Sequence, residues 1–150
     1  MNDTENKGRI LVIDDDETIQ RVFRTGLMQE GFEVDVASTG KEAVGKSETQ
    51  LYNVALIDIR LSDMEGTQLL TKLKETIPKM RKIIVTGYPD LQNAIASVQK
   101  GADYYITKPT GMDELVKVVN EQLQKQQEEK QYSERKVAQF VETRLRGTPT

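Results

Sequence analysis

The chain contains neither cysteine nor histidine. Without cysteine it can form no disulfide, no thiolate metal site and no cysteine nucleophile, and a reducing compartment is allowed. Without histidine it lacks the commonest general base, the usual zinc ligand and any phosphohistidine carrier. The chemistry that remains belongs to carboxylates, lysines and hydroxyl groups.

Long apolar runs and an excess of basic charge are also missing. No apolar run approaches the length of a membrane span, and the polar residues 1–8 lack the core of a signal peptide. We therefore expect a soluble, cytoplasmic protein without a membrane partner. The formal net charge of −3 argues against a chain whose main task is to neutralise nucleic-acid phosphates. A length of 150 residues favours one domain.

Five short apolar runs alternate with segments of helical periodicity. Continuous apolar strands are typical of a parallel sheet that is buried on both faces by helices, so we predict an α/β fold. The predicted strands lie at residues 10–13, 34–37, 54–57, 83–85 and 104–106. The third helix is predicted to end at Pro78 and to carry an apolar stripe of Leu69, Leu70, Leu73 and Ile77.

The last part of the chain predicts one long helix. Residues 112–146 contain neither glycine nor proline, which allows a helix of about 50 Å. Every residue in 124–131 is polar, so this stretch should project into solvent or fray. An apolar stripe then returns, and it either folds back on its own domain or binds a second copy or a partner. The stripe consists of Val137, Phe140, Val141 and Leu145.

Acidic and basic residues stand where the predicted strands end. Ligands of open α/β sheets bind outside the carboxyl ends of the strands, and Asp14, Asp15, Asp58, Thr86 and Lys108 all lie at such ends. Three carboxylates together favour Mg²⁺ or a similar hard cation. A carboxylate also attacks phosphorus when metal, ammonium and hydroxyl groups neutralise the incoming charge. The pattern therefore predicts a site that receives a phosphoryl group, in which Asp58, Lys108 and Thr86 supply the carboxylate, ammonium and hydroxyl groups.

Four motifs carry a resemblance to a known family: ILVIDDD at 10–16, ALID at 55–58, IVTG at 84–87 and GADYYITKP at 101–109. In order and separation they resemble the receiver domain of two-component response regulators. The resemblance implies a flavodoxin-like (βα)5 sandwich, with a five-stranded parallel sheet in the order 2-1-3-4-5 and an extended C-terminal helix. We expect a receiver domain at 9–122, a helical extension at 123–146, and disorder at 1–8 and 147–150.

The resemblance also assigns the phosphoryl chemistry. Asp58 would accept the phosphoryl group from the phosphohistidine of a sensor histidine kinase. Asp15 would bind Mg²⁺ directly, Asp14 would bind it through water, and Asp58 and the backbone carbonyl of Arg60 would complete the protein ligands. Lys108 would pair with the phosphate. The protein would be a signalling switch that catalyses only its own modification.

A second group of residues would transmit the signal. By the resemblance, Thr86 moves toward the new phosphate and Tyr105 turns inward behind it, which changes the surface over the fourth helix and fifth strand. Gly87 would leave room for the phosphoryl donor, and Pro109 would follow a cis peptide bond. That surface, or the C-terminal helix, is where we expect a homodimer to form.

The chain departs from the family pattern in places. Ser62 stands where the family usually has proline, and Thr110 stands where it has phenylalanine, which predicts a looser metal-ligand loop and a lost packing anchor. Arg60 and Tyr88 occupy positions that influence phosphate loss in the family. Bulky side chains there predict slow self-dephosphorylation, and loss of label within seconds would contradict this.

The same residues allow other interpretations. Asp16 is better explained as the cap of the first helix. A haloacid dehalogenase-type hydrolase needs a second aspartate two residues after the nucleophile, where this chain has Arg60. A dinucleotide site needs a glycine-rich turn in place of residues 14–16. The mild basic excess of residues 135–146 supports DNA contact only weakly, and a stand-alone receiver and a fragment both stay open.

Overall fold

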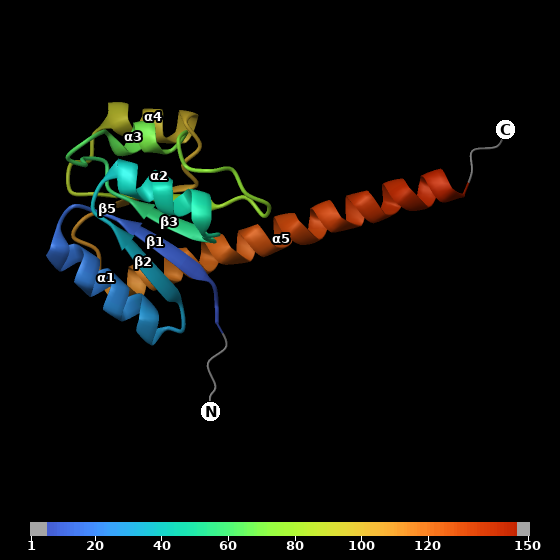
Figure 1. Ribbon diagram of the computed structural model, residues 1–150, viewed down its shortest axis with the longest axis horizontal. Helices are drawn as coiled ribbons and strands as arrows, with labels where there is room; N and C mark the ends of the chain where they lie inside the picture. The colour runs from blue at the N-terminus through green and yellow to red at the C-terminus, as the bar shows by residue number, and fades with distance from the viewer. Residues whose placement is uncertain (1–5, 147–150) are drawn as a thin grey trace.

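The computed structural model describes residues 6–146, so the disorder expected for residues 1–5 and 147–150 falls outside it. Five strands form one parallel sheet in the order β2-β1-β3-β4-β5, as predicted (Figure 1). Asn6 and Lys7 bond to the neighbourhood of β2. The strands are β1 (Arg9–Ile13), β2 (Glu33–Ala37), β3 (Val54–Ile57), β4 (Arg81–Thr86) and β5 (Tyr104–Thr107).

Helices separate the strands and cover both faces of the sheet. Their first residues are fixed by local caps: the Asp16 carboxylate accepts from the amides of Thr18 and Ile19, and the Thr39 hydroxyl accepts from that of Glu42. Asp16 is therefore a helix cap, as predicted. The helices are α1 (Glu17–Gln29), α2 (Gly40–Thr49), α3 (Gly66–Leu69), α4 (Leu91–Gln99) and α5 (Met112–Leu145).

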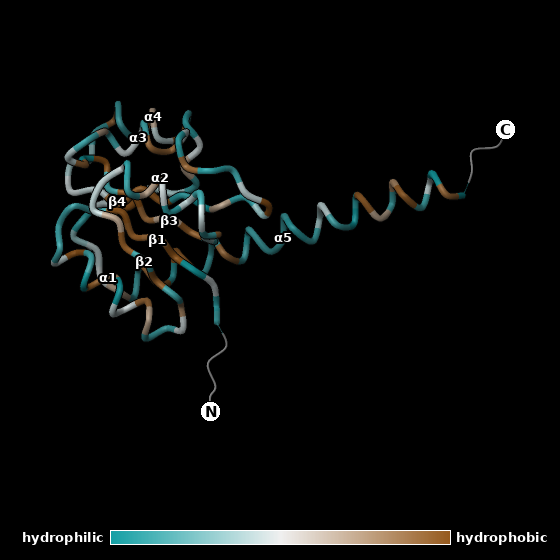
Figure 2. The backbone as a smooth tube through the Cα atoms, in the orientation of Figure 1, coloured by the Kyte–Doolittle hydropathy of each residue, from teal (hydrophilic) through white to brown (hydrophobic). Residues whose placement is uncertain are grey.

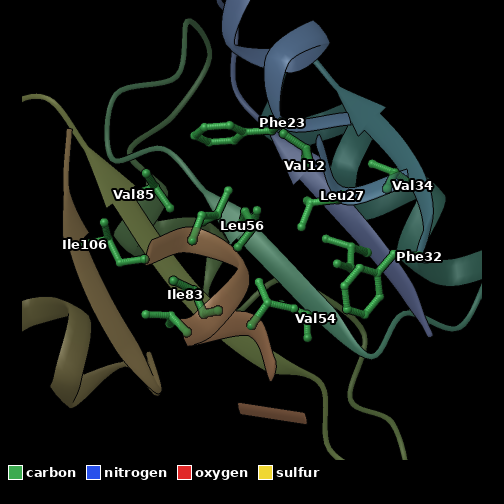
Figure 3. Packing of buried hydrophobic residues seen from close by; sticks show 14 residues of the cluster. Val12, Phe23, Leu27, Phe32, Val34, Val54, Leu56, Ile83, Val85 and Ile106 are labelled. Carbon is green, nitrogen blue, oxygen red and sulfur yellow. The ribbon is translucent and has the colours of Figure 1, made fainter. Parts of the chain in front are cut away.

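The core consists of two apolar layers, one on each face of the sheet. Successive strand residues point to opposite faces, so Ile10 and Val12 of β1 join one layer while Leu11 and Ile13 join the other. Figure 3 shows the first layer, in which Phe23 and other residues of α1 and α5 pack on the strands. Residues of α2 and α3 form the second layer.

The third helix is shorter than predicted. It ends at Leu69, and the chain continues to β4 as turns and irregular backbone. Leu73 is still buried, but Ile77 is 97% exposed, so its assignment to the core stripe was wrong. Proline disfavours helical backbone at the residue before it, which keeps Ile77 out of a helix.

The fifth helix is continuous from Met112 to Leu145, and its second half projects away from the domain (Figures 1 and 2). Its distal apolar stripe is exposed, so the structure does not have the folded-back arrangement. The polar stretch was expected to leave the domain, yet Gln126 is only 5% exposed because its amide bonds to Asn53 and Lys79. Within residues 6–146, no helix is both long and apolar enough to cross a membrane.

Candidate functional site

The register of the sheet brings three aspartates together. Ile13 of β1 is paired with Ile57 of β3, so Asp14 and Asp58 follow neighbouring strands at the same edge. One carboxylate oxygen each from Asp14, Asp15 and Asp58 lies within 4.8 Å of the others. Asp14 is 3% exposed and Asp58 is 8% exposed, whereas Asp15 is exposed. The structure thus forms the carboxylate cluster that the sequence predicts.

Lys108 reaches this cluster from the edge of the sheet. It follows β5, and its Nζ lies 2.7 Å from Oδ2 of Asp14 and 3.6 Å from Oδ2 of Asp58. The peptide bond between Lys108 and Pro109 is cis. A residue 94 positions along the chain from Asp14 is therefore part of the same site.

The charges of the site shift the pKa values of its groups. Burial and the neighbouring Asp14 carboxylate raise the pKa of Asp58, against the opposing charge of Lys108. Burial alone would lower the pKa of Lys108, but its contacts with Asp14 and Asp58 outweigh this and raise that pKa. The lysine therefore stays an ammonium, and three carboxylates that face one cation favour a further, divalent cation.

Backbone contacts hold the carboxylates in place. The amide of Asp16 donates to Oδ1 of Asp14 at 2.9 Å, and the amide of Arg60 donates to Oδ1 of Asp58 at 3.4 Å. Gly66 packs directly against the backbone of Asp58, at the end of β3. A Cβ added at Gly66 would lie only 2.2 Å from the backbone oxygen of Asp58. Sequence reasoning missed Gly66, whose only signal was its position at the start of a helix.

The loop after Asp58 is closed by main-chain contacts. The amide of Leu61 donates to the carbonyl of Met64 at 3.2 Å, and Arg60 forms an isolated antiparallel bridge with Glu65. The loop around Ser62 therefore has regular backbone contacts in spite of the missing proline. These contacts place the main chain of Arg60 next to the carboxylate cluster.

Thr86 begins a chain of hydrogen bonds that leads to α4. Its fully buried hydroxyl accepts from the amide of Tyr88 at 2.9 Å, and the Tyr88 carbonyl accepts from the Asn93 amide group at 3.0 Å. The Asn93 oxygen accepts from the hydroxyl of Tyr105. Sequence reasoning missed Asn93, although Asp90 and Asn93 form a capping box at the start of α4.

Arg60, Gly87 and Tyr88 are three more residues that the sequence predicts for this site. The guanidinium carbon of Arg60 lies 4.0 Å from the centre of the Tyr88 ring, a cation–π contact. Gly87 faces the Lys108 side chain, since a Cβ added at Gly87 would find only Lys108 atoms, at 3.9 and 4.0 Å. Arg60 thus contacts Asp58 through its amide and Tyr88 through its side chain, and Gly87 lies next to Lys108.

Residues 10–120 match the family model of the response regulator receiver domain. The chain belongs to this family. It is 35% identical over 124 residues to the alginate biosynthesis transcriptional regulatory protein AlgB of Pseudomonas syringae pv. tomato, an alignment that covers 83% of the chain and 28% of AlgB. The chain therefore spans less than a third of the length of this relative.

Solved structures agree with this assignment. A CheY-like receiver domain protein from Methanospirillum hungatei matches with a TM-score of 0.78 and 45% identity, over 81% of this chain and 97% of that one. A response regulator from Burkholderia pseudomallei, solved with a phosphorylated aspartic acid and a calcium ion, matches with a TM-score of 0.69 and 27% identity, over 81% and 71% of the two chains. The chain is thus a receiver domain of the kind that phosphorylation switches.

Proposed function

We propose that Asp58 is the phosphoryl acceptor of this receiver domain and that a sensor histidine kinase is the donor. A carboxylate oxygen of Asp58 attacks the phosphorus of a phosphohistidine, and the P–N bond breaks. Its electron pair stays on the imidazole nitrogen, and an acyl phosphate forms on Asp58. The observation that carries the proposal is the convergence of Asp14, Asp15, Asp58 and Lys108 at one strand edge.

The donor set of this site fits Mg²⁺. Carboxylate and carbonyl oxygens are the ligands of hard cations, and the three acids present oxygens within 4.8 Å of one another. We assign Asp15 as a direct ligand, Asp14 as a ligand through water, and Asp58 and the Arg60 carbonyl as the remaining protein ligands. Mg²⁺ bound there would neutralise charge on the transferring phosphoryl group. Lys108 supplies the second positive charge, directly beside Asp58.

The signal would leave the site through Thr86 and Tyr105. Movement of the Thr86 hydroxyl toward the phosphate releases the Tyr88 amide, and an inward turn of Tyr105 breaks its bond to Asn93. The response then reaches the face of α4 and β5, which carries a set of exposed apolar side chains suited to an effector or a second copy. These side chains are Leu91, Ile95, Val98 and Tyr104.

We also assign the boundaries of the receiver domain and of its helical extension within the chain. Residues 9–122 form the receiver and 123–146 its helical extension, and the receiver catalyses only its own phosphoryl uptake and loss. The Arg60 amide contacts Asp58 and the Arg60 guanidinium lies over the Tyr88 ring, so two bulky side chains meet near Asp58, which supports slow loss of the phosphoryl group. Arg60→Ala should shorten the lifetime of the acyl phosphate, as followed by the decay of label from the purified protein.

Incubation with acetyl phosphate and Mg²⁺, followed by intact-mass spectrometry, tests the proposal. We expect a single phosphoryl mass increment that requires Mg²⁺. Asp58→Asn should abolish it, and Lys108→Ala should retain some uptake but lose the structural response. Uptake by the Asp58→Asn protein equal to that of the unaltered chain would contradict the assignment of Asp58.

A further inference from the structure

The distal half of α5 carries an exposed apolar stripe, and Arg144 of the same helix places its guanidinium carbon 4.9 Å from the centre of the Phe140 ring. Val137, Phe140 and Val141 are exposed, although their spacing of three and four residues is that of a packed helix face. Figure 2 shows these apolar turns on the part of the helix that projects from the domain. The stripe therefore offers a packing surface to a partner outside this domain.

The stripe continues the face with which α5 packs on its own domain. Val137 follows the buried Gln126 by 11 residues, which is about three helical turns, so the two lie on the same side of the helix. A groove of about 820 Å³ lies between this face and the loop that contains the exposed Ile77. Its helix side runs from Glu129 to Ala138, so groove and stripe form one surface.

Charge along the helix selects the orientation of a second copy. Residues 128–134 carry three acids and one lysine, whereas residues 135–146 carry four bases and one acid, which gives net charges of −2 and +3. Parallel helices would place like charges side by side, and antiparallel helices place opposite charges together. Among the described residues 6–146, Glu134 in the groove forms no ion pair, while Glu129 is held by Arg81.

We propose that two copies of this chain pair through the distal halves of α5 in an antiparallel arrangement. Val137 of one copy packs on Phe140 of the other, which brings Arg144 level with Ser133 and Glu134. Leu145 of each copy then reaches the groove beside Ile77 of the other. The pairing is independent of the phosphoryl chemistry, because α5 leaves the domain at the amino ends of the strands, where Glu129 contacts Arg81.

Sedimentation analysis of the full chain over a dilution series tests the pairing. We expect a reversible dimer, and Val137→Asp and Phe140→Asp should each give a monomer. Tyr132→Asp is the matched control, since Tyr132 is equally exposed but lies about 140° around the helix from Val137. A monomeric full chain at every concentration would leave the stripe to another partner and overturn the proposal, as would a dimer that survives both substitutions.

Disulfide cross-linking tests the orientation, because the chain has no cysteine of its own. Ser133→Cys and Arg144→Cys proteins should remain uncross-linked when oxidised separately and should cross-link when mixed. Cross-links in each separate sample, with none added by mixing, would show parallel helices and overturn the antiparallel arrangement. Asp58→Asn should leave both results unchanged, so a failure of the phosphoryl proposal is distinguishable from a failure of this one.

Discussion

Asp58 is held in a setting that disfavours its charge. Its pKa is raised by burial and by Asp14, so the folded protein keeps the Asp58 proton at a pH where the unfolded chain has lost it. Ionised Asp58 therefore destabilises the folded protein. This destabilisation reaches its full size at a pH above the folded-state pKa of Asp58 and disappears at a pH below its unfolded-state pKa. Without metal, Asp58→Asn should therefore raise the thermal unfolding midpoint at pH 7 by about 3 °C, the effect of roughly 1 kcal/mol.

Thermal unfolding followed by circular dichroism in EDTA checks this prediction. The gain should shrink as the pH falls through the folded-state pKa toward 4, and the exposed Glu121→Gln control should show no such trend. Lys108 opposes the gain only weakly, since it keeps its 2.7 Å contact with Asp14 when Asp58 is neutral. An Asn variant that is less stable at pH 7 than the unaltered protein would show that the Lys108 contact dominates.

Gly66 supports Asp58, the proposed phosphoryl acceptor, through the backbone. A methyl group at this position would lie 2.2 Å from the Asp58 carbonyl oxygen and 2.9 Å from the Cα of Ile59, and neither main-chain atom can move without displacing the carboxylate. Gly66→Ala should therefore cost about 1–3 kcal/mol of stability and slow phosphoryl uptake as well. Denaturant unfolding and the acetyl phosphate reaction measure the two effects.

Gly45 provides the control for this substitution. It lies inside α2 with no atom within 4 Å of an added Cβ, so Gly45→Ala should stabilise the protein by about 0.5–1 kcal/mol and leave uptake unchanged. If the Gly66→Ala protein accepted the phosphoryl group at the normal rate, the close contact between Gly66 and the backbone of Asp58 would matter for stability but not for the reaction.

Individual site residues were predictable to different degrees. Asp14, Asp58 and Lys108 follow apolar strands, so a sequence pattern places them at one sheet edge. Gly66 and Asn93 act through contacts that depend on the exact course of two loops, one to a carbonyl and one to Tyr105. No local pattern specifies those contacts, and this is why sequence reasoning passed over both residues.

At the scale of elements, α5 is anchored by polar groups where an apolar stripe is missing. The Gln126 amide donates to the carbonyls of Asn53 and Lys79 at 3.1 and 2.8 Å, and Arg81 holds Glu129 at 2.7 Å. Because these residues are polar, the sequence predicts that they face solvent. The helix therefore leaves the domain several residues later than the sequence predicts. A buried glutamine that satisfies two carbonyls serves the same end as a leucine.

This anchor leads to a prediction for Gln126→Ala. The substitution removes the side-chain donor to the Lys79 carbonyl and the acceptor of the Asn53 side-chain amide, while the Asn53 carbonyl keeps the Arg81 amide as a donor. A buried unsatisfied polar group costs about 1–3 kcal/mol. We expect a loss of that size in urea unfolding. Gln127→Ala, one position further along and exposed, should change stability by less than about 0.5 kcal/mol. Equal losses in the two variants would mean that helix propensity, not the anchor, sets the effect.

At the scale of the whole molecule, the phosphoryl site and the projecting helix lie at opposite ends of the sheet. The site follows the carboxyl ends of the strands, and α5 leaves beside Arg81, the first residue of β4. The hydrogen bonds from Thr86 through Tyr88 and Asn93 to Tyr105 begin at the carboxyl end of β4, beside the site, and lead into α4. The response to phosphorylation should therefore appear on the side of the domain and not along α5.

Hydrogen–deuterium exchange of the phosphorylated protein checks this last prediction. Asn93 caps α4 together with Asp90 and also binds Tyr105, so an inward turn of Tyr105 removes one of the bonds that fix this helix start. We expect faster exchange in residues 91–95 and no change in residues 137–145. Thr86→Ala should keep phosphoryl uptake at Asp58 and lose the change in α4. A response confined to α5, or one that persists without the Thr86 hydroxyl, would show that the signal takes another path.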